Sequence, residues 1–287
     1  MTKVACIGEA MIEVSAQGTN ARLGVAGDTL NTAIYLKRAA PQVTVDYITR
    51  LGDDPFSDQI AAFIAQEGIG TAPIRIERGG SPGLYAITTD DAGERTFTYW
   101  RAQAAARGLF ADGDFSILSD YDLLYLSGIS IAILPPNVRA GLLDAIQQSP
   151  ALLAFDSNFR PRLWEDKTPA AETISAYWEA CDIPRPSIED EANLFDETET
   201  QVIERWQAAT QRGALKRGGM GPMSIGAPVD QTYASVDNVI DTTAAGDSFC
   251  GGYLAARLTG SDQAEALRAG HDQAARVIQH PGAIIPR

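Results

Sequence analysis

The amino-acid sequence predicts an α/β fold built on a mainly parallel β-sheet, with a small additional β-sheet inserted in it. Short apolar runs that are typical of buried strands alternate with segments of helical periodicity along most of the chain. Between residues 74 and 100 this alternation is interrupted by the period-two pattern of a β-hairpin. A chain of 287 residues can bury a large core in one such domain, so we expect a single domain over residues 1–287.

The first elements are strands and helices in alternation. Residues 3–8 form an apolar run that ends in glycine, as expected of a buried parallel strand whose carboxyl end opens onto a site. Residues 11–25 lack helical spacing, and we expect strands or loops outside the main sheet. Residues 43–51 are predicted to form a second strand, followed by a helix that starts at Pro55 and closes at Gly68.

A polar string, Gly27-Asp28-Thr29-Leu30-Asn31, precedes the apolar stripe of the first helix. Asp28 is a good N-cap for this helix, and capping alone would explain its presence. Asp28 and Asn31 would also both stand near the exposed end of the helix, where they can contact a ligand. The residues by themselves leave both interpretations open.

The interruption at residues 84–101 is expected to be a hairpin with its turn at residues 90–93. Side chains two apart share a face of a strand, so Tyr99 and Arg101 lie on one face, and Tyr85 can join them from the partner strand. Two tyrosines and an arginine would then line one concave surface. An ordinary solvated hairpin with aromatic cross-strand pairs is the alternative.

Strand and helix alternate again after residue 110, with strands expected over residues 122–128 and 152–156. The second of these strands leads into Asp156-Ser157-Asn158-Phe159-Arg160-Pro161-Arg162, at the edge of a parallel sheet where ligands bind. Arg160 offers a planar pair of donors for a carboxylate, the group that separates a sugar acid from a neutral sugar. A surface salt bridge is the alternative for this arginine.

The stretch Asp241-Thr242-Thr243-Ala244-Ala245-Gly246-Asp247 has the small residues of a loop that enters a helix. We expect the backbone N–H groups of Ala245, Gly246 and Asp247 to be unpaired and to attract an anion. The Asp247 carboxylate among them can accept a proton from a hydroxyl group, while the donors stabilise a phosphoryl group. This combination suits phosphoryl transfer to an alcohol.

Capping is the alternative explanation of this stretch, because Asp241, Thr242 or Thr243 could each cap the helix. Two glycines within the helix favour a more specific interpretation. Gly251 and Gly252 each cost roughly 1 kcal/mol of helix stability relative to alanine. We therefore expect another part of the molecule to approach this helix closely.

A glycine-rich turn follows an apolar run at residues 214–221. Its glycines let the backbone approach a ligand closely, and Lys216 or Arg217 can meet a phosphate group. Such turns are also common in ordinary hairpins. Further on, a helix over about residues 262–279 is expected to pack beside the helix that follows Asp247, and the only two histidines of the sequence, at positions 271 and 280, are expected to be structural or on the surface.

Charge and composition exclude several classes of protein. A net charge of −14 and a pI of about 4.5 argue against nucleic acid or an anionic membrane as partner, because both bind basic surfaces. No apolar run reaches the roughly 18 residues of a membrane span and no signal-peptide pattern is present, so we expect a cytoplasmic protein. Cys6, Cys181 and Cys250 lack metal-ligand spacing and are expected to be buried free thiols.

Two enzyme classes are rejected on physical grounds. The chain contains no Gly-Lys-Ser or Gly-Lys-Thr of a Walker A loop. Residues 79–83 match the G-x-S-x-G pattern of a serine-hydrolase nucleophile, but Pro82 lacks the N–H group that the oxyanion hole would require. We therefore expect a turn at this position.

These strings together resemble the ribokinase-like, or phosphofructokinase B type, carbohydrate kinases from Gly8 to Arg287. Within that family GDTLN, YWR, DSNFRP and GAIIPR are most similar to the 2-keto-3-deoxygluconate kinases. Three positions depart from the family pattern. The usual G-A-G-D is Ala244-Ala245-Gly246-Asp247, the usual Asn-x-x-Glu has Ser187 and Asp190, and a common Asn is replaced by Asp272.

The resemblance implies a three-layer α/β/α core with a β-sheet lid from about residues 11–26 and 72–103, and a dimer formed through the lid. It implies ATP and Mg²⁺ as cofactors and small molecules, a sugar acid and ATP, as partners. The implied catalytic residues are Asp247 as general base, Gly246 and Ala245. The implied sugar contacts are Gly27, Asp28, Asn31, Tyr85, Tyr99, Arg101 and Arg160. The implied nucleotide contacts are Lys216, Gly218, Gly219, Gly221, Gly246 and Asp272, and a water-mediated metal contact falls on Asp190.

The function implied is ATP-dependent phosphorylation of 2-keto-3-deoxygluconate to its 6-phosphate. A kinase for a neutral sugar such as fructose or ribose is the alternative within enzymes. A catalytically silent sugar or nucleotide sensor is the alternative from another class of protein.

Overall fold

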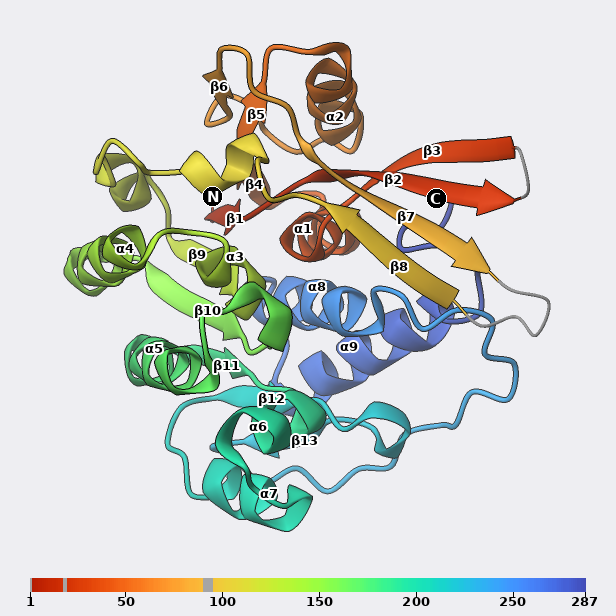
Figure 1. Ribbon diagram of the computed structural model, residues 1–287. Helices are drawn as coiled ribbons and strands as arrows, with labels where there is room; N and C mark the ends of the chain where they lie inside the picture. Colours follow the sequence, from red (N-terminus) through yellow and green to blue (C-terminus); the bar gives the residue numbers. More distant parts are fainter. Residues whose placement is uncertain (1, 18–19, 90–94) are drawn as a thin grey trace.

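The computed structural model describes residues 2–17, 20–89 and 95–287 (Figure 1), so the predicted hairpin turn at residues 90–93 lies outside the described residues. Its main sheet has the order β11-β10-β9-β1-β4, and every pair of neighbours is parallel. The five strands are β1 (Lys3–Ile7), β4 (Thr44–Ile48), β9 (Leu123–Ser127), β10 (Leu152–Asp156) and β11 (Ile183–Arg185). The strand order reverses at β1, which has β4 on one side and β9 on the other. A ligand crevice is expected at the carboxyl ends of strands beside such a switch point.

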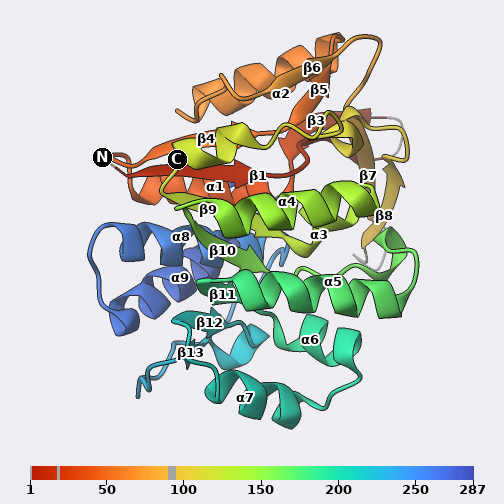
Figure 2. The ribbon, with the colours of Figure 1, turned by 90° about the vertical axis from the view of Figure 1, so that its left-hand side faces the viewer.

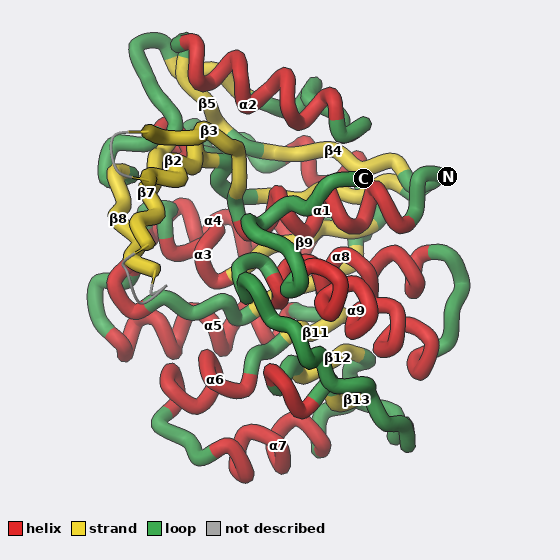
Figure 3. Tube along the Cα trace, turned by 90° about the vertical axis from the view of Figure 1, so that its right-hand side faces the viewer, coloured by secondary structure: helices red, strands yellow, loops and turns green. Residues whose placement is uncertain are grey.

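Helices cover both faces of this sheet. They are α1 (Asp28–Ala39), α2 (Pro55–Gln66), α3 (Gly128–Ala132), α4 (Pro136–Gln148), α5 (Lys167–Ala180), α6 (Ile188–Phe195), α7 (Glu199–Gln207), α8 (Ala245–Leu258) and α9 (Gln263–Val277). Figure 2 shows α4 and α5 in front of the strands, and Figure 3 shows α8 and α9 from the opposite side. Within the described residues, no helix has the length and apolar character needed to cross a membrane.

The core is divided by the sheet because side chains alternate along each strand. In β1, Val4 and Cys6 pack in the core formed with α1, α8 and α9, whereas Ala5 and Ile7 pack in the core formed with α4 and α5. This arrangement confirms the predicted three-layer α/β/α fold with a mainly parallel sheet. The three cysteines are buried and free, as expected.

Helix α8 lies between α1 and α9, and its two internal glycines explain how closely they pack. A methyl group on Gly251 would come within 2.6 Å of Tyr35 on α1, and one on Gly252 within 2.8 Å of the Ala269 carbonyl on α9. The expected close approach to this helix is therefore confirmed. It packs α8 tightly between α1 and α9.

A separate four-stranded sheet has the order β3-β2-β7-β8. Its strands are β2 (Met11–Gln17), β3 (Asn20–Ala26), β7 (Gly83–Thr89) and β8 (Arg95–Trp100). Tyr85 lies opposite Tyr99 in the register of β7 and β8, with ring centroids 5.6 Å apart, so the predicted shared face is confirmed. Both strand pairs fall in the two ranges expected for a lid.

The remaining strands form two small pairs. They are β5 (Arg50–Gly52) with β6 (Arg75–Glu77), and β12 (Gly213–Leu215) with β13 (Met223–Ile225). The predicted strand at residues 43–51 is thus two strands, β4 and β5, that join different sheets. β6 falls in the second range expected for the lid but pairs outside it. A bridge between Ser187 and Lys216 places the end of β12 beside the residues that follow β11.

Candidate active site

A cleft of about 1260 Å³ lies at the carboxyl edge of the main sheet, between this edge, the four-stranded sheet and helices α8 and α9. The expected site residues that line it are Gly27, Asp28, Asn31, Tyr85, Tyr99, Arg101, Arg160, Asp190, Lys216, Gly218, Gly219, Gly221, Ala245, Gly246 and Asp247. The structure therefore brings together residues that are up to 220 positions apart in the chain. Asp272 is the exception among the predicted site residues.

The start of α8 differs from both descriptions that the sequence suggested. Its N-cap is Ala244 in the left-handed region with φ of 60°, and none of the described side chains caps the helix, so the capping alternative is wrong. The Asp241 carboxylate instead accepts hydrogen bonds from the backbone of Thr243 (2.9 Å) and Gly282 (2.5 Å). This second contact ties the loop before α8 to the carboxyl-terminal tail.

The expected anion-binding donors are only partly available. The Ala245 N–H donates to the Thr242 carbonyl at 3.1 Å, so the prediction that it is unpaired is wrong. Among the described residues, the backbone N–H groups of Gly246 and Asp247 have no hydrogen-bond partner. The anion-binding capacity of this helix end therefore rests on two backbone donors.

Asp247 is enclosed at the base of the cleft. Its Oδ2 accepts a hydrogen bond from Asn31 Nδ2 at 2.9 Å, and its backbone carbonyl accepts one from Thr32 Oγ1 at 3.1 Å. Burial, followed by the negative charge of Asp28, raises the pKa of Asp247 to about 8, and the Asn31 hydrogen bond offsets only part of this. A carboxylate with a raised pKa is a stronger proton acceptor than an exposed aspartate.

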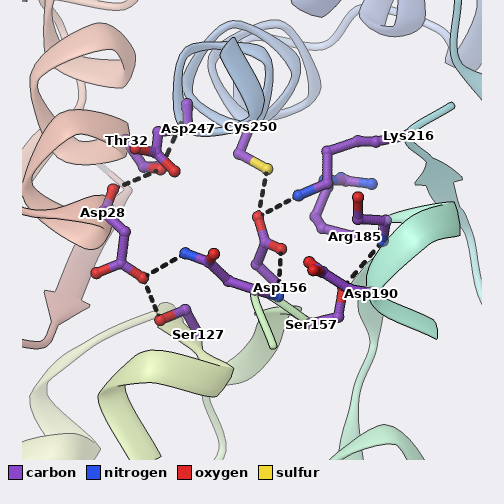
Figure 4. Close-up of polar contacts among 12 residues, drawn as sticks. Asp28, Thr32, Ser127, Asp156, Ser157, Arg185, Asp190, Lys216, Asp247 and Cys250 are labelled. Atoms are coloured by element: carbon purple, nitrogen blue, oxygen red, sulfur yellow. Dashed lines mark hydrogen bonds and ion pairs between the residues drawn. The ribbon is translucent and has the colours of Figure 1, made fainter. Parts of the chain in front are cut away.

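Asp28 is not the N-cap of α1. The helix begins at Asp28 and its N-cap is Gly27, with no capping hydrogen bond from a side chain that the structure describes. The Asp28 carboxylate instead accepts from Asn158 Nδ2 at 2.8 Å and from Ser127 Oγ, at the carboxyl ends of β10 and β9 (Figure 4). Asp28 thus joins α1 to the edge of the main sheet, and the capping alternative for this residue is wrong.

Asp156 is a cleft residue that the sequence analysis missed. It ends β10, is 1% exposed, and accepts hydrogen bonds from Lys216 Nζ at 2.5 Å and Cys250 Sγ at 3.2 Å (Figure 4). Burial opposes the charge of Lys216, but Asp156, together with Cys250 and Asp190, outweighs burial and raises the pKa of Lys216. A polar residue directly after the apolar run at residues 152–155 was the signal that could have identified Asp156.

The four-stranded sheet and the loop after β10 supply three arginines to one end of the cleft. Arg101 forms an ion pair with buried Glu9, and Arg160 forms one with Asp190 at 3.2 Å. Arg162, which the sequence analysis did not select, stacks on the Tyr99 ring at 4.2 Å. In the part of the chain that the structure describes, Arg162 has no carboxylate partner.

Two buried carboxyl groups at this end have perturbed protonation. Burial raises the pKa of Glu9 although Arg101 beside it acts in the opposite direction. Burial likewise raises the pKa of Asp190 against the effect of Arg160. Arg160 forms the salt bridge that was its alternative interpretation and also lines the cleft, so its contact with a ligand stays a prediction.

The other end of the cleft combines a glycine turn with apolar side chains. Gly218 and Gly221 adopt positive φ values of 54° and 75°, which side-chain-bearing residues rarely adopt. The apolar residues there are Val239, Ile240, Ala274, Ala275 and Ile278. An apolar wall beside a turn with exposed backbone suits a flat aromatic ring that carries phosphates.

The prediction that Asp272 contacts a nucleotide is not supported by its position. Asp272 is exposed on α9 and does not line the cleft. His271, Ala274, Ala275 and Ile278 do line it, since residues three, four and seven apart share one face of a helix. His271, which was expected to be structural or on the surface, donates a hydrogen bond from Nε2 to the Ala234 carbonyl at 3.0 Å.

Among residues 2–17, 20–89 and 95–287, no group of three or more His, Cys, Asp or Glu side chains could hold a metal ion. Asp190, the acid expected to act through water, is engaged by Arg160. The described part of the chain therefore offers isolated carboxylates to a cation and no cage of ligands.

A parallel sheet with a cleft at its switch point, a helix amino terminus and a buried carboxylate in that cleft define a kinase-type α/β enzyme. Residues 1–287 match the family described as pfkB family carbohydrate kinase, and the chain belongs to this family.

Named relatives cover almost the whole chain. 2-Dehydro-3-deoxygluconokinase of Escherichia coli (strain K12) is 40% identical over 305 residues, which cover 99% of this chain and 97% of that protein. The protein of the same name from Haemophilus influenzae is 36% identical over 304 residues, which cover 100% of this chain and 96% of that protein. The crystal structure of 2-dehydro-3-deoxygluconokinase from Thermotoga maritima has a TM-score of 0.79 at 20% identity, covering 99% and 96% of the two chains. This likeness confirms the ribokinase-like fold that the sequence resemblance implied.

Proposed function

We propose that this carbohydrate kinase transfers the γ-phosphoryl group of ATP to the terminal hydroxyl of 2-keto-3-deoxygluconate, which is also called 2-dehydro-3-deoxygluconate, giving the 6-phosphate. One observation carries the choice of a sugar acid. A protein with net charge −14 places Arg101, Arg160 and Arg162 at one end of its cleft, and Arg162 has no carboxylate partner among the described residues. The 36–40% identity to relatives of that name supports the same choice.

Asp247 acts as the general base in this proposal. The terminal hydroxyl oxygen forms a bond to the γ-phosphorus, the bond from that phosphorus to the bridging oxygen breaks, and ADP leaves with the bond electrons. The hydroxyl proton passes to the Asp247 carboxylate, whose raised pKa favours this step. The N–H groups of Gly246 and Asp247 face the developing charge on the phosphoryl oxygens.

The sugar end of the cleft orients the substrate. Tyr85, Tyr99 and Arg101 cover it from the four-stranded sheet, while Asp28 and Asn31 face it from the start of α1. We assign the four-stranded sheet the role of a lid that excludes water, which would otherwise compete with the sugar for the phosphoryl group.

The glycine turn and apolar wall at the other end take the nucleotide. Gly218, Gly219 and Gly221 offer backbone to its phosphates, and Val239 and Ile240, both about half exposed, offer apolar surface to its base. Mg²⁺ neutralises the charge of the nucleotide phosphates when bound. The isolated carboxylates of the cleft fit an ion of this kind, because Mg²⁺ is usually held by one or two carboxylates, water and substrate phosphates. Asp190 is the acid nearest to this role by sequence resemblance.

A kinase for a neutral sugar is the second candidate, and one observation favours it. Arg101 and Arg160 are already paired with Glu9 and Asp190, which leaves Arg162, of these three described arginines, for a substrate carboxylate. A silent sensor is disfavoured, since Asp247 retains a raised pKa and two free backbone donors beside it.

The test is ADP release by the purified protein with ATP and Mg²⁺, comparing 2-keto-3-deoxygluconate with fructose and ribose. The Asp247→Asn variant measures background ATP hydrolysis. A preference for the sugar acid of at least tenfold in kcat/KM supports the proposal. Preference for a neutral sugar refutes the substrate but keeps the kinase, and absence of turnover with all three favours the sensor.

We also propose that two copies pair through the outer face of the lid. Tyr85 faces the cleft, so its neighbour Leu84 faces away, in one row with Trp100. Val14 and Leu23 form the next row on the same outer face. Trp100 and Leu23 are 58% and 46% exposed, an apolar surface that a second copy would bury.

A further inference from the structure

The ion pair between Asp156 and Lys216 stands at the junction of the two ends of the cleft. Lys216 follows β12 and its backbone is fixed on both sides, because its N–H donates to the Pro186 carbonyl at 2.8 Å and its carbonyl accepts from Ile188 at 2.9 Å. Its side chain is only 14% exposed. The position of the Lys216 ammonium group is therefore determined by the atoms that surround it.

Those atoms place the ammonium group beside the anion-binding end of α8. A methyl group built on Gly246 would lie 3.5 Å from Lys216 Nζ. A cation beside the positive end of a helix, shielded from water, is unfavourable without a counter-charge. Asp156 supplies this counter-charge at 2.5 Å.

Asp156 is itself fixed by groups that do not depend on Lys216. Its Oδ1 accepts from the Asn158 backbone at 3.1 Å, and its Oδ2 accepts from Cys250 Sγ at 3.2 Å and Tyr125 Oη at 3.4 Å. The carboxylate is thus held by β9, β10 and α8. Lys216 is oriented by Asp156, and Figure 4 shows the carboxylate between Lys216 and Cys250.

The ammonium group retains donors for a ligand. An ammonium has three N–H donors, and in the described structure Lys216 Nζ uses one of them, toward Asp156. The ammonium group therefore lies beside the turn of α8 that carries the free N–H groups of Gly246 and Asp247. A cation beside such donors suits the oxygens of a transferring phosphoryl group, which gain charge density in the transition state.

We infer that Lys216 is a catalytic residue that contacts the transferring phosphoryl group, and that Asp156 is a positioning residue that acts only through Lys216. This inference rests on the proposed kinase function and extends it. It distinguishes Lys216 from a residue that merely binds ATP. A ground-state contact would change KM for ATP, whereas a contact made in the transition state changes kcat.

A double-mutant cycle tests the inference, with Asp156→Asn, Lys216→Met and the double variant assayed on whichever sugar the unaltered protein phosphorylates best. We expect Asp156→Asn and Lys216→Met each to lower kcat about 10²-fold, with KM for ATP within about threefold of the unaltered protein. The double variant should have the same kcat as Lys216→Met, because Asp156 has no effect once Lys216 is gone.

Two controls separate a loss of catalysis from a loss of folding. The double variant removes both members of the pair and leaves no unpaired buried charge, so it reports the loss of Lys216 even where either single variant is unstable. Glu191→Gln is the matched control, since Glu191 is also fully buried and paired with an arginine, Arg205, but does not line the cleft. It should keep kcat, which separates the loss of a buried charge from the loss of a group that lines the cleft.

Three outcomes would overturn the inference. The first is an Asp156→Asn variant with unaltered kcat, and the second is a rise in KM for ATP with unaltered kcat in Lys216→Met. The third is a double variant at least tenfold slower than Lys216→Met. A preference of the unaltered protein for a neutral sugar refutes the proposed substrate alone, and the cycle is then read with that sugar. Absence of turnover with every sugar would overturn both proposals.

Discussion

Replacing Asp247 with asparagine is expected to have opposite effects on activity and on stability. The substitution preserves the size of the side chain and its acceptor for Asn31, but removes the proton acceptor and a buried negative charge. Loss of a general base lowers kcat by about 10²–10⁴-fold. Loss of a charge that burial and Asp28 both disfavour should stabilise the folded protein.

The size of the stabilisation follows from the pKa. In the folded protein the pKa of Asp247 is raised from 3.8 to about 8. Between these values the folded state holds a proton that the unfolded state has released, so the stability of the unaltered protein falls as pH rises through this window. Each pKa unit corresponds to about 1.4 kcal/mol, so the stabilisation by Asp247→Asn has an upper bound of about 6 kcal/mol. Relaxation and water entry reduce this, and we expect a gain of about 1–2 kcal/mol for Asp247→Asn at pH 8 that vanishes near pH 4.

Urea denaturation of both proteins at pH 4, 6 and 8 measures this difference, and kcat/KM of the unaltered protein over the same range checks the base. The rate should rise with pH up to about 8, because only the ionised carboxylate accepts a proton. Asp46→Asn is the control, since Asp46 pairs with Lys3 away from the cleft and should affect neither quantity in this way. Equal stability of Asp247→Asn and the unaltered protein at every pH would refute the raised pKa, and unchanged turnover would refute the base.

Three further predictions follow from the cleft and the lid. Arg162→Met should raise KM for a sugar acid about tenfold while changing KM for fructose less than twofold, because a lost hydrogen bond to a charged group is worth about 1.5–3 kcal/mol; an equal change for both sugars in the coupled ADP assay would contradict it. Gly27→Ala should lower the free energy of unfolding by about 1–3 kcal/mol in urea titrations, since the added methyl group would lie 2.2 Å from the Glu9 carbonyl. An unchanged free energy of unfolding would show that the backbone shifts without cost. Leu23→Glu combined with Trp100→Glu should convert a dimer to a monomer in sedimentation velocity with kcat nearly retained, and an unchanged sedimentation coefficient would place any dimer contact elsewhere.

The spacing of apolar residues and the order of strands and helices along the chain were sufficient to predict most of the fold. The alternation of strands and helices along one sequence determines a parallel sheet with helices on both faces, and period two in the hairpin placed Tyr85 and Tyr99 on one face. The break of the strand at residues 43–51 was not predicted. It depends on which neighbour each half meets, since β4 pairs with β1 and β5 with β6.

The residues missed at the site share a different cause. Asp156 becomes a site residue by meeting Lys216, which is 60 positions further along the chain. Arg162 becomes one by stacking on Tyr99 of the other sheet. Neither contact has a local signature, because both arise only when separate elements pack together. For the same reason Asp28 looked like an N-cap until its carboxylate was seen to reach Ser127.

The carboxylates of the cleft differ in how fully their oxygens are used, and this difference supports one of them as the base. Asp28 accepts from Ser127 and Asn158, and Asp156 accepts from Lys216 and three further donors. Asp247 accepts a single side-chain hydrogen bond among the described residues, from Asn31. Donors to a carboxylate lower its affinity for a proton, whereas burial and neighbouring negative charges raise it. Asp28 therefore increases the basicity of Asp247. The oxygens of Asp28 and Asp156 are occupied by other donors, which leaves Asp247 as the acceptor for a substrate proton.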